Sequence, residues 1–248
     1  MSKTFDSMIP SIELRERAWL QARERVARTH PSPVYPSITI SRQYGCEGYP
    51  LAQQLKLILE EASGRTWTIF DKALVDKVAS DEQLSRELLN RLGDESHAQD
   101  VLRTHFGYLT HVDAYAKLVK HIIPIAAAGC AIIVGRGGAI TCQGLKNCFH
   151  FRLVGSLEFR SSTLARRLGM PLAEAEELVR TQSKLREKFI SDCLQADITS
   201  SDWYDAVFNN ERQRVETIAQ ACLGLVVRGW PEKDTFRHGP LHASEAHR

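Results

Sequence analysis

The chain lacks long hydrophobic runs and a strong excess of one charge, and we expect no N-terminal leader. No run approaches the ~18 apolar residues of a membrane span, and the polar residues 1–10 contain no signal-peptide core. The 32 Lys and Arg residues nearly balance the 30 Asp and Glu residues, so the net charge of +2 gives no argument for a nucleic acid polymer or an anionic membrane as partner. We therefore expect a cytoplasmic protein in which any anion site is local.

Paired cysteines are also lacking. The six cysteines form no C-x-x-C pair and no metal-like spacing with histidine, so we expect reduced or buried thiols and no metal bound by the chain itself. They are Cys46, Cys130, Cys142, Cys148, Cys193 and Cys222. One alternative stays open for Cys46, because a nearby Arg42 and an expected helix N-terminus would lower its thiol pKa and favour a redox-sensitive cysteine.

What the chain does have is enough apolar sequence for a large core. Its 248 residues, 43% of them hydrophobic, are typical of a soluble protein of one or two domains. Residues 11–27 predict an amphipathic helix, and the proline-rich stretch 31–36 marks a boundary. We expect an N-terminal helix and linker over 1–30, a main domain over 31–227, and a mobile polar tail over 228–248.

Within the main domain, short apolar strands alternate with helices. We expect strands at 37–41, 131–134, 149–154 and 206–208, and a helix that follows a glycine-bearing turn after the first strand. Ser156 and Gly169 are expected to begin and end a helix, a charged helix should follow over 172–194, and a last helix should begin at Glu211. Residues 81–121 read as a helical insertion. The pattern predicts a three-layer α/β fold, with a mostly parallel sheet covered by helices on both faces.

Two glycine loops follow expected strands, which is where open parallel sheets bind ligands. The first contains Gly45 and Gly48, whose neighbouring backbone N–H groups can hold a phosphate with help from Arg42. The Walker pattern G-x-x-x-x-G-K-[ST] is not satisfied, so a plain glycine turn is the alternative. The second loop carries Gly135 and Arg136, and we expect both loops to share one crevice.

The order of motifs from residue 38 to 219 resembles the cytidylate kinase-like family of nucleoside monophosphate kinases. The matching pieces are ITISRQYGCEGYPLA, IFDKALVDKVA, AIIVGRGGAI, FHFRLVGSLEFR with ARRLG, and WYDAVFNN. The resemblance implies a P-loop kinase fold with a helical insertion and a lid. It also implies phosphoryl transfer from ATP with Mg²⁺ to CMP or a related nucleoside monophosphate.

The resemblance further implies roles for particular residues. The ATP phosphates would be held by Arg42, Gly45, Cys46, Gly48 and Tyr49. The acceptor nucleotide would meet Asp71, Gly135 and Arg136. The arginines of the lid and its hinge would be Arg160, Arg166, Arg167 and Arg186.

The phosphate loop departs from the family pattern G-S-G-G-[RK], because Glu47 adds a negative charge and Tyr49 replaces a basic residue. The lid pattern T-D-x-R-R reads Gln182-Ser183-Lys184-Leu185-Arg186 here, with one arginine of the pair and no aspartate. Two functions therefore remain: a nucleotide kinase, and a degenerate, catalytically weak or inactive nucleotide-binding regulatory protein. The sequence does not determine the oligomeric state.

Overall fold

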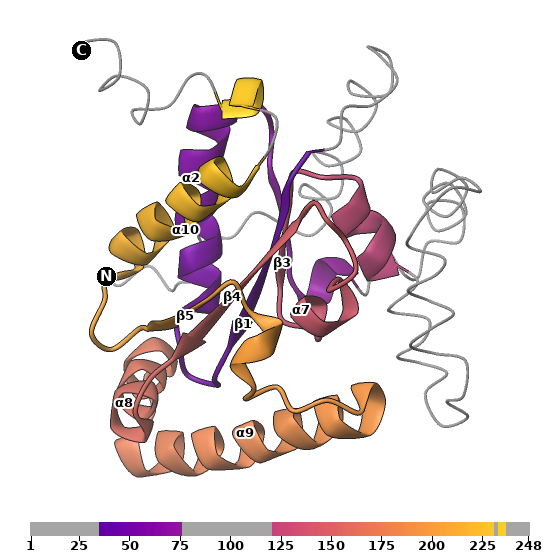
Figure 1. Cartoon of the computed structure of the whole chain (residues 1–248). Helices are drawn as coiled ribbons and strands as arrows, with labels where there is room; N and C mark the ends of the chain where they lie inside the picture. Colours follow the sequence, from indigo (N-terminus) through magenta and orange to yellow (C-terminus); the bar gives the residue numbers. More distant parts are fainter. Residues whose placement is uncertain (1–34, 76–120, 231–232, 237–248) are drawn as a thin grey trace.

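The computed structural model describes residues 35–75, 121–230 and 233–236 (Figure 1). The helix expected at 11–27 and almost all of the insertion expected at 81–121 lie outside these residues. The described elements, in chain order, are β1 Ser37–Arg42, α2 Gly48–Ser63, β2 Thr68–Phe70, β3 Ala131–Val134, α7 Gly138–Thr141, β4 Cys148–Val154, α8 Leu157–Leu168, α9 Leu172–Leu194, η2 Ser201–Trp203, β5 Ala206–Asn209, α10 Val215–Gly229 and η3 Lys233–Phe236.

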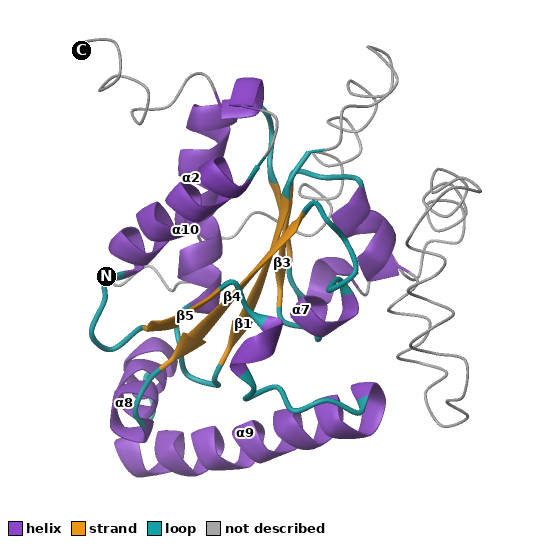
Figure 2. Cartoon of the chain, in the orientation of Figure 1, coloured by secondary structure: helices purple, strands orange, loops and turns teal. Residues whose placement is uncertain are grey.

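The strands form one five-stranded sheet in the order β2-β3-β1-β4-β5, with every neighbouring pair parallel (Figure 2). This confirms the expected parallel sheet flanked by helices. Strand β2 was not expected, because three residues are too few to show an alternating pattern. β1 lies at the centre of the sheet, so the loop that follows it emerges in the middle of the carboxyl edge.

The two faces of the sheet have different chemistry. On one face, Ile38 and Ile40 of β1 are fully buried in a core built with α2 and α10. On the other face, Thr39 lies against α7, and its hydroxyl is hydrogen-bonded to Nδ1 of His150 at 2.8 Å. Because successive side chains of a strand point to opposite faces, Ser41 follows Thr39 on this polar side.

Helix α8 begins and ends where its sequence predicts. The Ser156 side chain accepts a hydrogen bond from the Phe159 N–H, and Gly169 adopts a left-handed conformation directly after the helix. The predicted start of the last helix was wrong by four residues, because α10 begins at Val215. The backbone N–H groups of Glu211 and Arg212 donate instead to the side chain of Asn209, which holds this segment in a turn.

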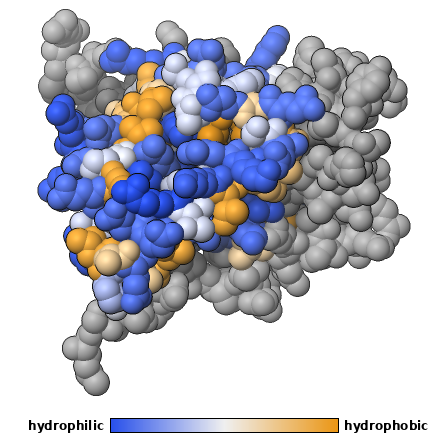
Figure 3. All heavy atoms as spheres, turned by 90° about the horizontal axis from the view of Figure 1, so that it is seen from below, coloured by the Kyte–Doolittle hydropathy of each residue, from blue (hydrophilic) through white to orange (hydrophobic). Residues whose placement is uncertain are grey.

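The carboxyl ends of the strands face α8 and α9, which lie across this edge of the sheet (Figure 1). Seen from that side, the surface is mostly hydrophilic with separate hydrophobic patches (Figure 3). Leu185 and Phe189 of α9 are among the exposed hydrophobic side chains. None of the helices in the described ranges is long and apolar enough to cross a membrane.

The core continues past residue 227, where a mobile tail was expected to follow. Helix α10 extends to Gly229, and the side chains of Trp230 and Phe236 are buried in the same core as β1. The Trp230 indole N–H also donates to the hydroxyl of Thr235 at 3.2 Å. Residues 228–230 and 233–236 therefore belong to the folded domain.

Candidate functional site

Two adjoining cavities lie at the carboxyl edge of the sheet, beside α9. The larger has a volume of about 390 Å³ and the smaller about 310 Å³. The loop after β3 (residues 135–138) lines the larger cavity, and the loop after β1 (residues 43–49) lines the smaller. The structure thus brings the two glycine loops to one edge, but they line two adjoining cavities and not the single crevice that was expected. The residues common to both cavities are Arg42, Lys72, Val134 and Arg186.

The Arg42 side chain joins the two loops. It runs between Gly48 and Gly135, so a side chain at either position would have to displace the Arg42 side chain. A Cβ atom on Gly135 would lie 2.1 Å from Nη1 of Arg42, and one on Gly48 would lie 3.0 Å from its Cδ. The two glycines therefore allow the Arg42 guanidinium to lie at the junction of the cavities.

Arginine side chains from three elements converge around this junction. Burial and the neighbouring charges of Arg186 and Arg167 lower the pKa of Arg42 to about 9. Burial, with the charge of Arg152 acting in the same direction, also lowers the pKa of Arg186. Mutual repulsion at this edge would be relieved by a bound anion, and guanidinium groups suit phosphate oxygens.

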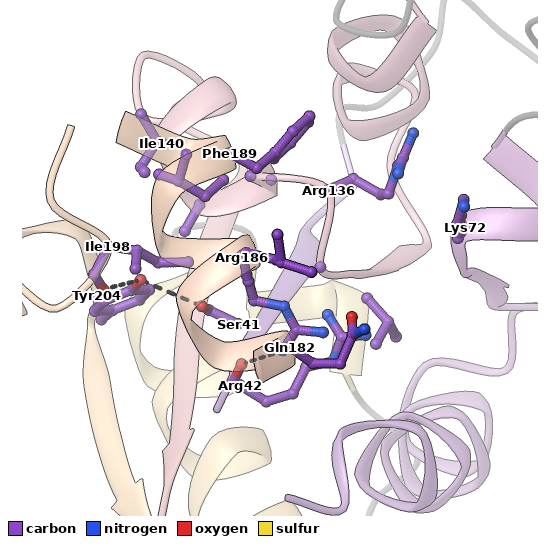
Figure 4. A pocket seen from close by; sticks show the side chains of 17 residues that line it. Ser41, Arg42, Lys72, Arg136, Ile140, Gln182, Arg186, Phe189, Ile198 and Tyr204 are labelled. Carbon is purple, nitrogen blue, oxygen red and sulfur yellow. Dashed lines mark hydrogen bonds between the residues drawn. The ribbon is translucent and has the colours of Figure 1, made fainter. Parts of the chain in front are cut away.

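Helix α9 contacts the first loop through Arg186. Its Nη1 donates to the backbone carbonyl of Arg42 at 2.8 Å, and its guanidinium lies 5.5 Å from the centre of the Tyr44 ring. Figure 4 shows Arg186 beside Arg42, with Gln182 one turn earlier on the helix. The contact positions the α9 side chains over both cavities.

Arg136 has an unusual backbone conformation. Its φ is 58°, in the left-handed region that non-glycine residues rarely adopt, and Gly135 and Gly137 on either side also have positive φ. The three residues line the larger cavity. Strained backbone of this kind persists where the surroundings enforce it, and it is concentrated at functional sites.

Arg160 and Arg166 lie outside both cavities, unlike Arg167 and Arg186. The Arg160 guanidinium donates to the backbone carbonyls of Gly155 and Tyr44, at 3.1 and 3.2 Å. These bonds tie the first glycine loop to α8. Arg160 therefore has a structural role in this conformation, and Arg166 is exposed on the last turn of α8.

Several backbone donors of the first loop already have partners within the protein. The Glu47 N–H donates to Oδ1 of Asn210 at 2.8 Å, and the Asn210 amide donates to the Glu47 carboxylate at 3.3 Å. The N–H groups of Cys46 and Gly48 donate to loop carbonyls, and Pro50 has no N–H at all. Fewer backbone amides are thus available to an anion than the glycine pattern predicts.

The redox hypothesis for Cys46 was wrong. Burial raises the pKa of the Cys46 thiol to about 11, and the nearby charge of Arg160 offsets only part of this effect. The thiol is therefore protonated at neutral pH and is a poor nucleophile. Its side chain packs in the core below the loop.

Asp71 and Tyr49 line the smaller cavity, so Asp71 lies with the first loop and not with Arg136. Its carboxylate accepts a hydrogen bond from the Leu74 N–H at 2.9 Å, as a helix cap does. Among the described residues, no group of three or more His, Cys, Asp or Glu side chains could hold a metal ion. A Mg²⁺ ion that arrives with nucleotide phosphates needs only one or two protein carboxylates, and Asp71 offers one.

Sequence analysis missed part of the lining. The larger cavity also contains side chains that were not named as candidate site residues, although most of them lie in the matched motifs, namely Ser41, Lys72, Gln182, Phe189 and Tyr204. Lys72 follows the edge strand β2, and Tyr204 precedes β5. No sequence signal placed either residue in the site, since β2 itself was not expected and Tyr204 lies before its strand, and the order and register of the strands are needed to bring them together.

Comparisons with known proteins agree with this fold. No curated protein matches the chain. A solved structure, an uncharacterized protein from Eubacterium ventriosum, is similar with a TM-score of 0.60 and 18% sequence identity, over 78% of this chain and 98% of that chain. At that identity the likeness shows the fold alone. The sequence itself matches the cytidylate kinase-like family over residues 37–212, well over half of its length, and the chain therefore belongs to the cytidylate kinase-like family.

Proposed function

We propose that this protein is a nucleotide kinase that transfers a phosphoryl group from ATP, with Mg²⁺, to a nucleoside monophosphate such as CMP. The observation that carries the proposal is the convergence of Arg42 and Arg186 where the two cavities meet, with Arg167 nearby in the lining of the smaller cavity. Phosphoryl transfer depends mainly on positioning two phosphates and neutralising their charge. Membership of the family supports the same reaction.

In this proposal each cavity binds one substrate. The smaller cavity, with Gly45, Tyr49 and Asp71, receives the ATP phosphates, and the larger, with Arg136, receives the acceptor. Asp71 would hold the Mg²⁺ that arrives with ATP, and the ion would supply positive charge that neutralises the phosphates. Because Arg42 lines both cavities, its guanidinium would lie close to the path of the transferred group.

Arg186 would act in two ways. Its guanidinium would supply positive charge at the junction, and its hydrogen bond to the Arg42 carbonyl would hold α9 against the first loop when substrates are bound. Closure excludes water, which strengthens the electrostatic contacts and prevents hydrolysis of ATP. Arg167 lies at the mouth of the smaller cavity and would steer the triphosphate toward it.

A second candidate function is nucleotide binding with little or no turnover. The pairing of Asn210 with Glu47 favours this second function. Asn210 holds the Glu47 carboxylate in the phosphate loop and also accepts the Glu47 backbone N–H, which is then not available to a phosphate. A carboxylate near a triphosphate opposes its binding. Binding and turnover must therefore be measured separately.

The test is a steady-state assay of ADP formation with CMP, UMP and dCMP, together with calorimetric titration of ATP and each monophosphate. Arg186→Gln and Arg167→Gln should each lower kcat/KM about tenfold or more, because a charge-assisted hydrogen bond contributes roughly 1.5 to 3 kcal/mol. Arg180→Gln is the matched control on α9, since Arg180 is exposed and paired with Glu176 outside both cavities.

Each outcome has a distinct meaning. Turnover that falls in Arg186→Gln and Arg167→Gln but not in Arg180→Gln supports the kinase. Tight nucleotide binding without turnover in the parent protein supports the second candidate. Absence of both binding and turnover would overturn the two functions together.

A further inference from the structure

Three polar side chains meet beneath the larger cavity. Nη1 of Arg152 donates to Oγ of Ser41 at 3.2 Å and to the hydroxyl of Tyr204 at 3.1 Å. Ser41 and Arg152 are paired across β1 and β4, so the sheet itself fixes their approach. Ser41 and Tyr204 line the cavity (Figure 4), whereas Arg152 is only 5% exposed and lies outside its lining.

The hydrogen atoms in this cluster can be assigned one by one. Arg152 can only donate, so both hydroxyl oxygens accept from it. The backbone carbonyl of Ile198 can only accept, and the Tyr204 hydroxyl lies 2.9 Å from it, so the tyrosine proton goes there. Oγ of Ser41 and the Tyr204 oxygen lie 3.2 Å apart, which is long for a bond between hydroxyl groups whichever of them donates, so this contact does not hold the Ser41 proton strongly. A better-placed acceptor in the cavity can therefore take the Ser41 proton.

Ser41 lies between two chemically different ends of the cavity. Arg42 and Arg186 form a cationic end next to it (Figure 4). The opposite wall is apolar, and its Ile140, Ile190 and Ile198 belong to one buried cluster. A phosphate monoester that places its phosphate at the arginines would direct its uncharged body toward the isoleucines and pass Ser41.

We propose that Ser41 is a specificity-determining residue that donates a hydrogen bond to an uncharged oxygen in the body of the phosphoryl acceptor. The inference rests on the proposed function, because it assumes that the larger cavity holds a phosphate monoester. The oxygen is a carbonyl, hydroxyl or ether of the molecule beyond its phosphate group. Recognition of this kind selects among molecules that carry the same phosphate.

Arg152 and Tyr204 are positioning residues in this proposal. By donating to Oγ, the buried Arg152 polarises the Ser41 O–H bond and makes it a stronger donor. Tyr204 is fixed by its bond to Ile198 and by the Arg152 guanidinium, which lies 5.4 Å from the centre of its ring. Together they hold Oγ at the cavity floor.

The test uses calorimetric titration of the full chain with inorganic phosphate, ribose 5-phosphate, CMP and UMP. The variants are Ser41→Ala, Tyr204→Phe and the double variant, with Arg186→Gln to weaken the cationic end. Ser161→Ala is the matched control for loss of a hydroxyl, because the Ser161 side chain is buried outside both cavities and its oxygen makes no hydrogen bond. None of these variants changes Arg152, whose replacement would leave a cavity in the sheet.

Ser41→Ala should weaken the affinity for CMP and UMP about 5-fold and leave the affinity for inorganic phosphate unchanged, as expected for the loss of one neutral hydrogen bond. Tyr204→Phe should have a smaller effect in the same direction, and the double variant should be no worse than Ser41→Ala, since Tyr204 acts through Ser41. Arg186→Gln should lower the affinity for all four probes. Ser161→Ala should match the parent protein.

The inference is overturned if Ser41→Ala weakens inorganic phosphate by the same factor as CMP, which would place Ser41 in the anion site. Unchanged affinity for every probe in Ser41→Ala also overturns it. If the parent protein binds phosphate esters and Arg186→Gln weakens them, the proposed function survives either result. If the parent binds none of the probes, the proposed function fails and this inference fails with it.

Discussion

His150 lies in β4, opposite Thr39 of β1, with its imidazole on the polar side of the sheet. Burial lowers its pKa to about 4, although the nearby Asp205 carboxylate acts in the opposite direction. In the unfolded chain the pKa is near 6.5, so between these values the unfolded state binds the extra proton. Stability should therefore fall as the pH is lowered, by about 2 kcal/mol between pH 7 and pH 5.

Urea unfolding at pH 7, 6 and 5 measures this loss. His150→Gln keeps a polar side chain but removes the titrating group, so its free energy of unfolding should depend less on pH over the same range. The other titratable groups are the same in both proteins, so their contribution cancels when the pH dependence of the two free energies of unfolding is compared. Parallel pH profiles for the parent protein and the variant would contradict the prediction.

At the scale of single residues, sequence predicts local chemistry well and distant contacts poorly. The helix cap at Ser156 and the left-handed Gly169 were predicted because each depends on neighbours a few residues away. The structural role of Arg160 was not predicted, because the carbonyl to which it donates belongs to Tyr44, 116 residues earlier in the chain. The Ser41 and Arg152 pair likewise needs the strand register, which no single strand contains.

At the scale of elements, the first glycine loop and α8 approach each other closely at Gly45. Its φ is 99°, and a Cβ there would lie 2.6 Å from the carbonyl oxygen of Arg160. Gly169 also has a positive φ, but no atom lies within 4 Å of its Cβ position. Gly169→Ala should therefore cost about 1 kcal/mol of backbone strain, whereas Gly45→Ala should cost about 3 kcal/mol because the loop and helix must also separate.

Chemical denaturation of the two alanine variants at the same pH tests this difference. Nucleotide titration provides a second readout, because only Gly45→Ala should disturb the smaller cavity. Equal destabilisation by both substitutions would mean that the loop moves away from α8 at little cost.

The elements themselves were predicted where they are long or have chemical end signals. Strands β1, β3, β4 and β5 and helices α8 and α9 were confirmed, whereas β2 was missed because it has only three residues. The start of α10 was misplaced because the Asn209 side chain captures two backbone N–H groups that a helix would otherwise begin with. Side-chain capture of this kind depends on the tertiary position of β5.

At the scale of the whole molecule, the fold includes residues beyond the predicted domain end. Phe236 is 2% exposed within the main core, so Phe236→Ala should lower the free energy of unfolding by about 3 kcal/mol or more. Leu225→Ala on α10 is the control, because Leu225 is 42% exposed. Thermal and urea unfolding measure both. An effect of Phe236→Ala no larger than that of Leu225→Ala would place the domain boundary back at residue 227.

The alternation along β1 also affects which mutations the protein can tolerate during evolution. Ile38 and Ile40 are constrained by the core that they share with α2 and α10, so substitutions there lower the free energy of unfolding. Thr39 and Ser41 face the side of the sheet that carries the larger cavity, so changes there alter recognition while the other face keeps the fold. Relatives can thus diverge in ligand preference on the same scaffold. Insertion of one residue in β1 would turn core-facing side chains toward the cavity and cavity-facing side chains toward the core. Core packing and ligand recognition would then be lost together.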